Sequence, residues 1–210
     1  MCVVKERGTK NMRYLIIDTE TLGVNNQLIY NIGYLIYDTE TRAVKIARDY
    51  VITEIYDNDN LMQSAYYYNK KPIYEMRIAN GTCKRIKWSY ALRVLARDMK
   101  KYNVDKLYAF NSRFDMSSIK TTCSRYHTKN PTDIIHDIWK GQANPIITKQ
   151  PSYIEFCETY GFMTRHKTPR PRENAETLFA YLTNNPSYVE EHTALEDSKI
   201  ELEILLATLM

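Results

Sequence analysis

The chain has 210 residues, of which 44% are apolar and 26% are charged, an ordinary balance for one globular domain. It contains no run of about 18 apolar residues, which excludes a membrane-spanning helix, and its first residues lack the apolar core of a secretory signal. The net charge of +4 permits nucleic-acid binding without indicating it. The four cysteines show no CxxC spacing, so we expect reduced, mostly buried thiols in a soluble, cytoplasmic protein.

The first part of the chain predicts a strand and a hairpin. The apolar run at 14–17 is typical of a buried strand. Two β-rich runs, 28–38 and 43–52, are separated by a short polar stretch, as in a β-hairpin. Residues 56–87 are irregular and rich in Tyr and Asn, so we expect loop and short helix there.

From residue 88 onward, predicted helices and strands alternate. Apolar residues recur at helical spacing over 88–102, and Ser89 is placed to cap that helix. The remaining predicted elements are strand 106–110, helix 114–126, strand 133–139, helix 152–161 with the capping-box pattern Ser152-x-x-Glu155 and a stop at Gly161, and two helices around 174–183 and 194–208. This order predicts an α/β domain with a mixed β-sheet.

The string DTET occurs twice, and its two copies have different surroundings. In the first, Asp18 and Glu20 end a buried apolar run, and their i, i+2 spacing points both side chains the same way in an extended chain. Carboxylates held together at a buried strand end repel each other, and a divalent cation such as Mg²⁺ relieves that repulsion. A coincidental surface pair is the alternative. The second copy, 38–41, connects two strands, so we interpret it as a turn whose side chains face water.

A second acidic stretch, AFNSRFDMSSI, runs from a predicted strand into a predicted helix. It places Asp115 in the first turn of that helix. The alternative to a functional role is structural: Asn111 or Ser112 caps the helix, and Asp115 interacts favourably with its positive end.

The third stretch is the start of the last predicted helix. Thr193-x-x-Glu196 has the capping-box pattern, which makes Thr193 the N-cap, His192 the N′ residue and Asp197 the N4 residue. Those last two positions are the ones that a hydrophobic staple brings into contact, yet here they hold an imidazole and a carboxylate. The alternative is a surface histidine beside a solvated aspartate.

In this order, the three stretches resemble the motifs of the DEDDh family of 3′–5′ exonucleases, which includes the proofreading subunit of bacterial replicative polymerase, ribonuclease T and oligoribonuclease. In that family an Asp-x-Glu ends the first strand, an Asn-x-x-Phe-Asp follows a later strand and a His-x4-Asp opens the last helix. The resemblance covers roughly residues 12–208 and implies a ribonuclease H-like fold, with a mixed β-sheet flanked by helices in a single domain. Residues 12–210 would form the exonuclease domain and residues 1–11 an N-terminal extension. One departure is Phe110, where relatives often have His.

The resemblance also implies a set of site residues. Hydrolysis of phosphodiester bonds at the 3′ end of DNA or RNA would release nucleoside 5′-monophosphates, with two Mg²⁺ or Mn²⁺ ions as cofactors. His192 would act as general base. The expected cation ligands, which are also catalytic, are Asp18, Glu20, Asp115 and Asp197. The expected contacts to the terminal nucleotide are Thr21, Leu22 and Asn111.

Two rival functions stay open, as do the partners. One is a catalytically silent module that binds nucleic acid or protein in the same groove, and the other is a related nuclease that cuts internally. A homodimer and a complex with a polymerase or other replication protein are both compatible with the sequence. The basic stretch 165–172 is either a contact to the phosphate backbone or a solvated loop. Asp137 follows a predicted strand and is left out of the cation set because it suits a helix cap equally well.

Overall fold

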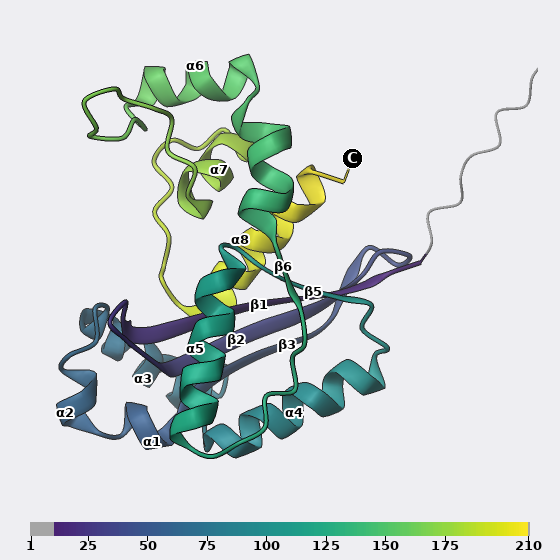
Figure 1. The fold of residues 1–210 in the computed structure, drawn as a ribbon, viewed down its shortest axis with the longest axis vertical. Coiled ribbons are helices and arrows are strands. Elements are labelled where there is room, and N and C mark those ends of the chain that lie inside the picture. Colours follow the sequence, from purple (N-terminus) through teal and green to yellow (C-terminus); the bar gives the residue numbers. More distant parts are fainter. Residues whose placement is uncertain (1–10, 210) are drawn as a thin grey trace, which may run out of the picture.

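Three long strands form an antiparallel meander at the centre of a six-stranded mixed sheet (Figure 1). The computed structural model describes residues 11–209, so nearly all of the expected N-terminal extension lies outside the described residues. The sheet order is β4-β3-β2-β1-β5-β6, and β4, β5 and β6 each pair in parallel with a neighbour. The strands are β1 (Arg13–Gly23), β2 (Asn26–Asp38), β3 (Ala43–Ile52), β4 (Lys84–Ile86), β5 (Lys106–Ala109) and β6 (Ile135–Asp137).

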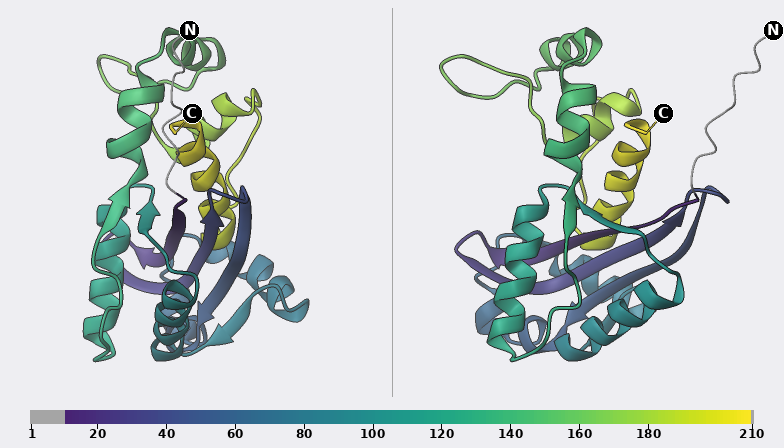
Figure 2. Two further views of the ribbon diagram at one scale, coloured as in Figure 1. Left: turned by 90° about the vertical axis from the view of Figure 1, so that its right-hand side faces the viewer. Right: turned by 45° about the vertical axis from the view of Figure 1, so that its right-hand side comes forward.

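Helices cover both faces of this sheet, and the predicted mixed sheet flanked by helices is confirmed. The first group is α1 (Thr53–Tyr56), α2 (Asp59–Met62), η1 (a 3₁₀ turn, Tyr68–Lys70), α3 (Lys71–Ala79), α4 (Trp88–Lys101) and α5 (Ser112–Arg125). The second group is η2 (a π-helix, Trp139–Thr148), α6 (Pro151–Tyr160), α7 (Ala175–Leu182) and α8 (Ala194–Ala207). Figure 2 shows η2, α6 and α7 stacked at one end, with the loop between α6 and α7 projecting from them.

The alternation of side chains along β1 divides the core into two clusters. Leu15 and Ile17 pack with residues of α4 and α5 on one face. Tyr14 and Ile16 pack with residues of η2, α6, α7 and α8 on the other. Because successive residues of a strand point to opposite faces, Asp18 continues the row of Ile16 and projects toward the α8 side. The same alternation that builds the core therefore aims the first acidic residue at the last helix.

Helix α8 lies very close to the sheet at Gly33 of β2. A Cβ atom at Gly33 would lie 2.1 Å from the backbone nitrogen of Leu195, a distance that real Cβ contacts do not show. In the β1–β2 register, Gly33 stands opposite Asp18. The missing side chain thus allows the first turn of α8 to lie beside the acidic end of β1.

Two predicted helix caps are wrong, and tertiary contacts explain why. Helix α4 begins at Trp88 after Lys87, so Ser89 lies inside it, and the Trp88 amide donates to the Glu54 carboxylate instead. Helix α6 begins at Pro151, and the Ser152 hydroxyl bonds the hydroxyl of Tyr181 at 2.8 Å rather than its own backbone. At both positions, hydrogen bonds to residues distant in sequence replace the local capping bonds that the pattern predicts.

Some elements differ from their predicted extents or were not predicted. The strand expected over 133–139 covers only Ile135–Asp137, and it leads into η2, which the sequence did not indicate. The segment 56–87 contains α3, a helix of nine residues, and the short parallel strand β4. β4 has only three residues, too few to show a strand pattern.

The second DTET forms a turn, as predicted, but Asp38 does not face water. It is buried, and its carboxylate accepts hydrogen bonds from the amides of Glu40 and Thr41 and from the Arg13 side chain. These donors, the Thr41 amide above all, lower the pKa of Asp38. Backbone amides and an arginine satisfy this carboxylate without a metal ion.

Two expectations from composition concern thiols and membranes. Cys83, Cys123 and Cys157 are free and buried, as expected, whereas Cys2 lies outside the described residues. Within residues 11–209, no helix has the length and apolar character needed to cross a membrane.

Candidate active site

A cleft of about 500 Å³ opens beside the middle of β1, around Thr19. It collects side chains from β1, from the loop after β5, from α5 and from the region around the start of α8. All five residues predicted to be catalytic line it, together with one of the three predicted nucleotide contacts: Asp18, Glu20, Asp115, His192, Asp197 and Asn111.

The topology explains why residues so distant in sequence meet here. β1 and β5 are parallel and adjacent, and their pairing ends at Ile16 and Tyr108. β1 continues past this point, so the first turn of α5 occupies the space beside Asp18 and Glu20. Asn111 makes the sharp passage from β5 into α5 with a left-handed backbone conformation (φ 59°), which Asn tolerates better than most residues.

Asp115 is fixed by the strand residue that lies between the two β1 acids. The Thr19 hydroxyl donates to Asp115 Oδ1 at 2.8 Å, and both side chains are buried. Thr19 points to the side of β1 opposite Asp18 and Glu20, so the strand places a donor on one face and two acceptors on the other. The bond orients the Asp115 carboxylate within the cleft.

Several oxygens in the cleft lack the partners that buried polar atoms usually have. Asp18 Oδ2, Asp197 Oδ1 and Glu201 Oε2 are buried and accept no hydrogen bond from any residue in the described range 11–209. A buried acceptor without a partner costs free energy, and a buried carboxylate costs more. A hard divalent cation with oxygen ligands satisfies such atoms, so the donor set fits Mg²⁺ or Mn²⁺.

The electrostatics of the cleft favour a cation or protons. Burial, followed by the negative charge of Glu201, raises the pKa of Asp18 well above its ordinary value. Burial is also the largest cause at the other three predicted ligands, and it raises the pKa of Glu20 to about 7, of Asp115 to about 7 and of Asp197 to about 9. Positive charge brought into the cleft would lower these pKa values again.

His192 lies at the mouth of the acidic cluster, beside Asp197, as the staple positions predict. Atoms of Glu20, His192 and Asp197 that can bind a cation all lie within 4.8 Å of one another. The imidazole stacks on the ring of Tyr67, with centroids 4.3 Å apart and planes 15° from parallel, and its Nδ1 is 3.7 Å from Glu190 Oε2. Burial, followed by the charge of Lys70, lowers the pKa of His192. The ring is therefore neutral near neutral pH and held from two sides.

The start of α8 is anchored by β2 rather than by a capping box. Thr193 is the N-cap residue, as predicted, but its hydroxyl donates to Glu191 instead of bonding the helix backbone. The Ala194 amide donates to the buried Asn31 side chain at 2.9 Å. The predicted role of Glu196 in a capping box is not observed, because its carboxylate pairs with Arg77 and Lys199.

Arg77 of α3 links this turn to the sheet. Its guanidinium contacts Asp49 at 3.3 Å, Glu191 at 2.6 Å and Glu196 at 3.2 Å. Asp49 also accepts a hydrogen bond of 2.7 Å from Asn31, so strand, helix and turn form one polar network. This network fixes the segment on both sides of His192.

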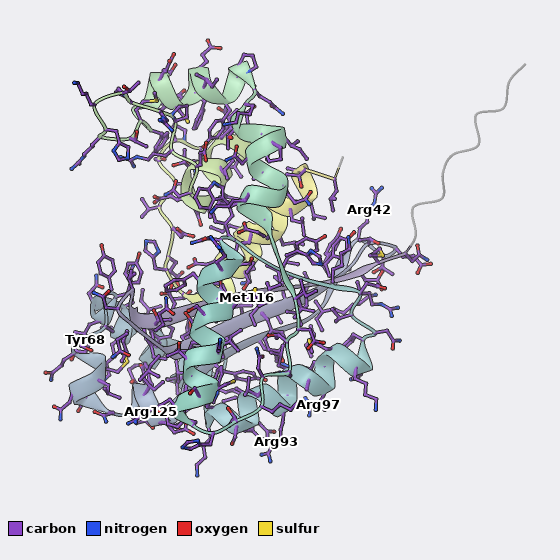
Figure 3. The ribbon with its side chains drawn as sticks, viewed as in Figure 1. Arg42, Tyr68, Arg93, Arg97, Met116 and Arg125 are labelled. Carbon is purple, nitrogen blue, oxygen red and sulfur yellow. The ribbon has the colours of Figure 1, made fainter. Side chains whose placement is uncertain are left out.

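Two of the predicted nucleotide contacts lie outside the cleft lining. Leu22 is buried in the core, and Thr21 is buried with its hydroxyl 3.5 Å from the carbonyl oxygen of Gly23. The Leu22 carbonyl accepts a hydrogen bond from the Tyr66 amide, which ties the end of β1 to the segment that carries Tyr67. Tyr68, one position further, points outward on the surface (Figure 3).

Several cleft residues were not predicted. Glu201 follows Asp197 by four positions, one helical turn, and that spacing was a signal available in the sequence. Tyr67 and Glu190 come from segments without a predicted element, and Trp139 ends the predicted strand 133–139 but belongs to none of the three motifs. Trp139 stacks on Phe110 with centroids 6.2 Å apart, which gives the cleft an aromatic wall where the family resemblance leads one to expect His.

Asp137 takes the role of a cap. Its Oδ1 accepts a hydrogen bond from the Lys140 amide at 3.0 Å, at the start of η2. It does not line the cleft. Its exclusion from the predicted cation set agrees with this position.

Comparisons with known proteins identify the fold. No protein-family model matches the chain, and no curated protein matches it by sequence. Among solved structures, it is similar to the nuclease domain of 3′hExo, a DEDDh family member, bound to rAMP, with a TM-score of 0.56 and 15% identity over 96% of this chain and 93% of that one.

Two longer structures match over 96% of this chain. One is a 3′-exonuclease in 3′-end-specific recognition of a histone mRNA stem-loop (TM-score 0.59, 15% identity), and the other is a full-length 3′-exonuclease (TM-score 0.54, 16% identity). The chain spans 64% and 61% of their respective lengths. The mixed sheet, its flanking helices and these matches together show that the chain has the ribonuclease H-like fold of the DEDDh-type exonuclease structures.

Proposed function

We propose that this protein is a divalent-cation-dependent 3′–5′ exonuclease that hydrolyses phosphodiester bonds at the 3′ end of DNA or RNA. The observation that carries the proposal is a set of buried carboxylate oxygens in one cleft that have no hydrogen-bond partner among residues 11–209, with a neutral imidazole beside them. The fold similarity to 3′-exonucleases supports the same conclusion.

Four carboxylates would hold the cations: Asp18, Glu20, Asp115 and Asp197. The chemistry that a pair of divalent cations supplies when bound is stabilisation of charge on the attacking and leaving oxygens of a phosphodiester. Thr19 keeps Asp115 in place through its hydroxyl, and the close approach at Gly33 keeps Asp197 beside the end of β1. Without such cations, four carboxylates would repel the anionic substrate.

His192 would accept the proton of the attacking water. Its Nδ1 faces Glu190, so we assign proton acceptance to Nε2. The lowered pKa keeps this nitrogen unprotonated at neutral pH. Tyr67 limits rotation of the ring by stacking on it.

The substrate would enter along the aromatic wall. Phe110 and Trp139 offer ring faces on which a base can stack, and Asn111 lies in the same cleft. Contacts from Thr21 and Leu22 to the terminal nucleotide stay a prediction, which their backbone groups would have to fulfil because both side chains are buried. The basic loop 165–172 would contact the phosphate backbone farther from the 3′ end.

The test uses 5′-labelled DNA and RNA oligonucleotides of equal sequence, incubated with Mg²⁺ or Mn²⁺. EDTA and Asp18→Asn serve as controls, because EDTA removes the cations and Asp18→Asn removes one charged ligand while keeping its shape. We expect metal-dependent shortening by one nucleotide at a time, and the faster substrate identifies the preferred polymer. Scattered products would indicate internal cutting, and intact oligonucleotides that bind in a gel shift would favour the silent binding module.

A further inference from the structure

Glu201 is a buried acidic side chain of the cleft. It lies on α8, one helical turn after Asp197, and only 3% of it is exposed. Its Oε2 accepts no hydrogen bond from the residues between 11 and 209. It lines the same cleft as Asp18 and Asp115, although it belongs to none of the three sequence motifs.

The surroundings of Glu201 are negative. Burial raises the pKa of Glu201 most, and the negative charges of Asp115 and Asp197 raise it further. A hydrogen bond from the Phe110 amide acts in the opposite direction and lowers this pKa. Conversely, among the charged neighbours of Asp18, Glu201 raises the pKa of Asp18 the most. Glu201 is therefore electrostatically part of the acidic cluster.

Packing alone does not explain a glutamate at this position. Its neighbours on α8, Leu202, Ile204 and Leu205, are buried and apolar, and they pack into the second core cluster. A buried carboxylate in a structural role has an arginine or backbone amides as partners, as Asp38 does. An apolar side chain of similar size would avoid the cost of burying an unpaired acid. The Phe110 amide serves this carboxylate, but residues 11–209 supply no partner for its Oε2.

We propose that Glu201 is a fifth carboxylate of the cation site and binds a divalent cation together with Asp18 and Asp197. The three unpartnered oxygens belong to these three residues, and all three residues line one cleft. The inference rests on the cation site of the proposed function and adds a ligand that the DEDDh-like motifs do not contain.

The experiment measures cation binding directly. Mn²⁺ is titrated into the full-length protein by isothermal titration calorimetry, and bound Mn²⁺ is counted by electron paramagnetic resonance. The variant is Glu201→Gln, which keeps the shape and removes the charge. The matched control is Glu203→Gln, two residues further on the same helix and exposed. We expect E201Q to lose about 10- to 100-fold in Mn²⁺ affinity, or one bound ion, and the control to behave as wild type.

Thermal unfolding provides a second readout. In EDTA, E201Q should melt at a higher temperature than wild type, because one like charge has been removed from the cluster. The rise in melting temperature that Mn²⁺ causes should be smaller in E201Q than in wild type. Wild-type Mn²⁺ affinity and stoichiometry in folded E201Q would overturn the proposal.

Glu201→Asp keeps the inference testable if E201Q does not fold. It retains the charge but withdraws the carboxylate by one methylene, so weaker Mn²⁺ binding is expected and unchanged binding would again overturn the proposal. The experiments also distinguish failure of the exonuclease proposal from failure of the proposed role of Glu201. Wild-type protein that binds Mn²⁺ but leaves oligonucleotides intact refutes the exonuclease proposal alone, whereas active protein whose Mn²⁺ binding ignores E201Q refutes only the role of Glu201.

Discussion

Gly33 of β2 and Leu195 of α8 approach so closely that a methyl group at Gly33 would lie 2.1 Å from the Leu195 nitrogen. Gly33→Ala must therefore push α8 away from the sheet or distort β2. We expect a loss of about 1–3 kcal/mol in the free energy of unfolding, measured by urea denaturation, and weaker Mn²⁺ binding because Asp197 moves with α8. Gly141→Ala is the matched control, since a Cβ at Gly141 meets nothing within 4 Å. Equal effects of the two substitutions would contradict the proposed constraint.

The buried carboxylates predict that the cation-free protein loses stability as the pH rises. Burial raises the pKa of Glu20 from 4.5 to about 7 and that of Asp197 from 3.8 to about 9. The folded state then binds more protons than the unfolded state, so the contribution of these groups is full below about pH 4 and is lost as the pH passes through 7 to 9. In EDTA, the melting temperature should fall by several degrees between about pH 6 and pH 9.

Saturating Mn²⁺ should remove most of that decline, because a bound cation replaces the protons. Asp197→Asn in EDTA should show a shallower decline than wild type, since a carboxyl group whose pKa is raised to about 9 by burial is gone. A melting temperature in EDTA that rises with pH over this range would show that the cluster is not protonated in the folded state.

Tyr67 should act as a positioning residue for His192, on which it stacks. Tyr67→Ala is expected to lower kcat by about tenfold or more with little change in KM, because the imidazole loses its fixed orientation. The same change exposes the ring, and burial is the main cause of its lowered pKa, so the acidic limb of the pH–rate profile should move to higher pH.

Tyr68→Ala is the control for this prediction, because Tyr68 lies next in sequence but faces solvent. It should leave both kcat and the pH profile unchanged. A lower kcat in Tyr67→Ala with an unmoved acidic limb would indicate a general structural effect rather than a contact to the base.

Two arginine–aspartate ion pairs should contribute differently to the free energy of unfolding. Arg77 is 13% exposed and pairs with Asp49, whose side chain is 1% exposed, so Arg77→Met would leave a buried charge unpaired. We expect a loss of about 3–5 kcal/mol in the free energy of unfolding. Arg85 pairs with Asp57 at the surface, where both side chains are exposed, and Arg85→Met should cost about 0–1 kcal/mol. Chemical denaturation measures the free energy of unfolding of both variants. Similar losses in the two variants would contradict the prediction.

Most of the fold was predictable because it depends on local patterns. The continuous apolar run at 14–17 indicated a buried strand, and the hairpin and the later helices followed from periodicity. The failed caps at Ser89 and Ser152 depend instead on Glu54 and Tyr181, which no local pattern connects to them. Short strands such as β4 form because they pair with a neighbouring strand, here β3, and not because of a pattern in their own residues.

The candidate site was predictable to the extent that its residues belong to short motifs. The spacing of Asp18 and Glu20, and the staple positions of His192 and Asp197, carry geometric information within a few residues. Glu201 was not predicted, because a glutamate on a helix ordinarily faces water. Only the packing of α8 on the sheet shows that this side chain is buried.

The anchoring of α8 on β2 has a consequence for synthesis of the chain. During translation the β1–β2 hairpin emerges long before α8, so Asp18 and Glu20 exist in the nascent chain without Asp197 or His192. Until α8 docks at Gly33, the cation site lacks its other wall and its proposed base. The proposed activity would therefore begin only after α8 has folded back onto the sheet.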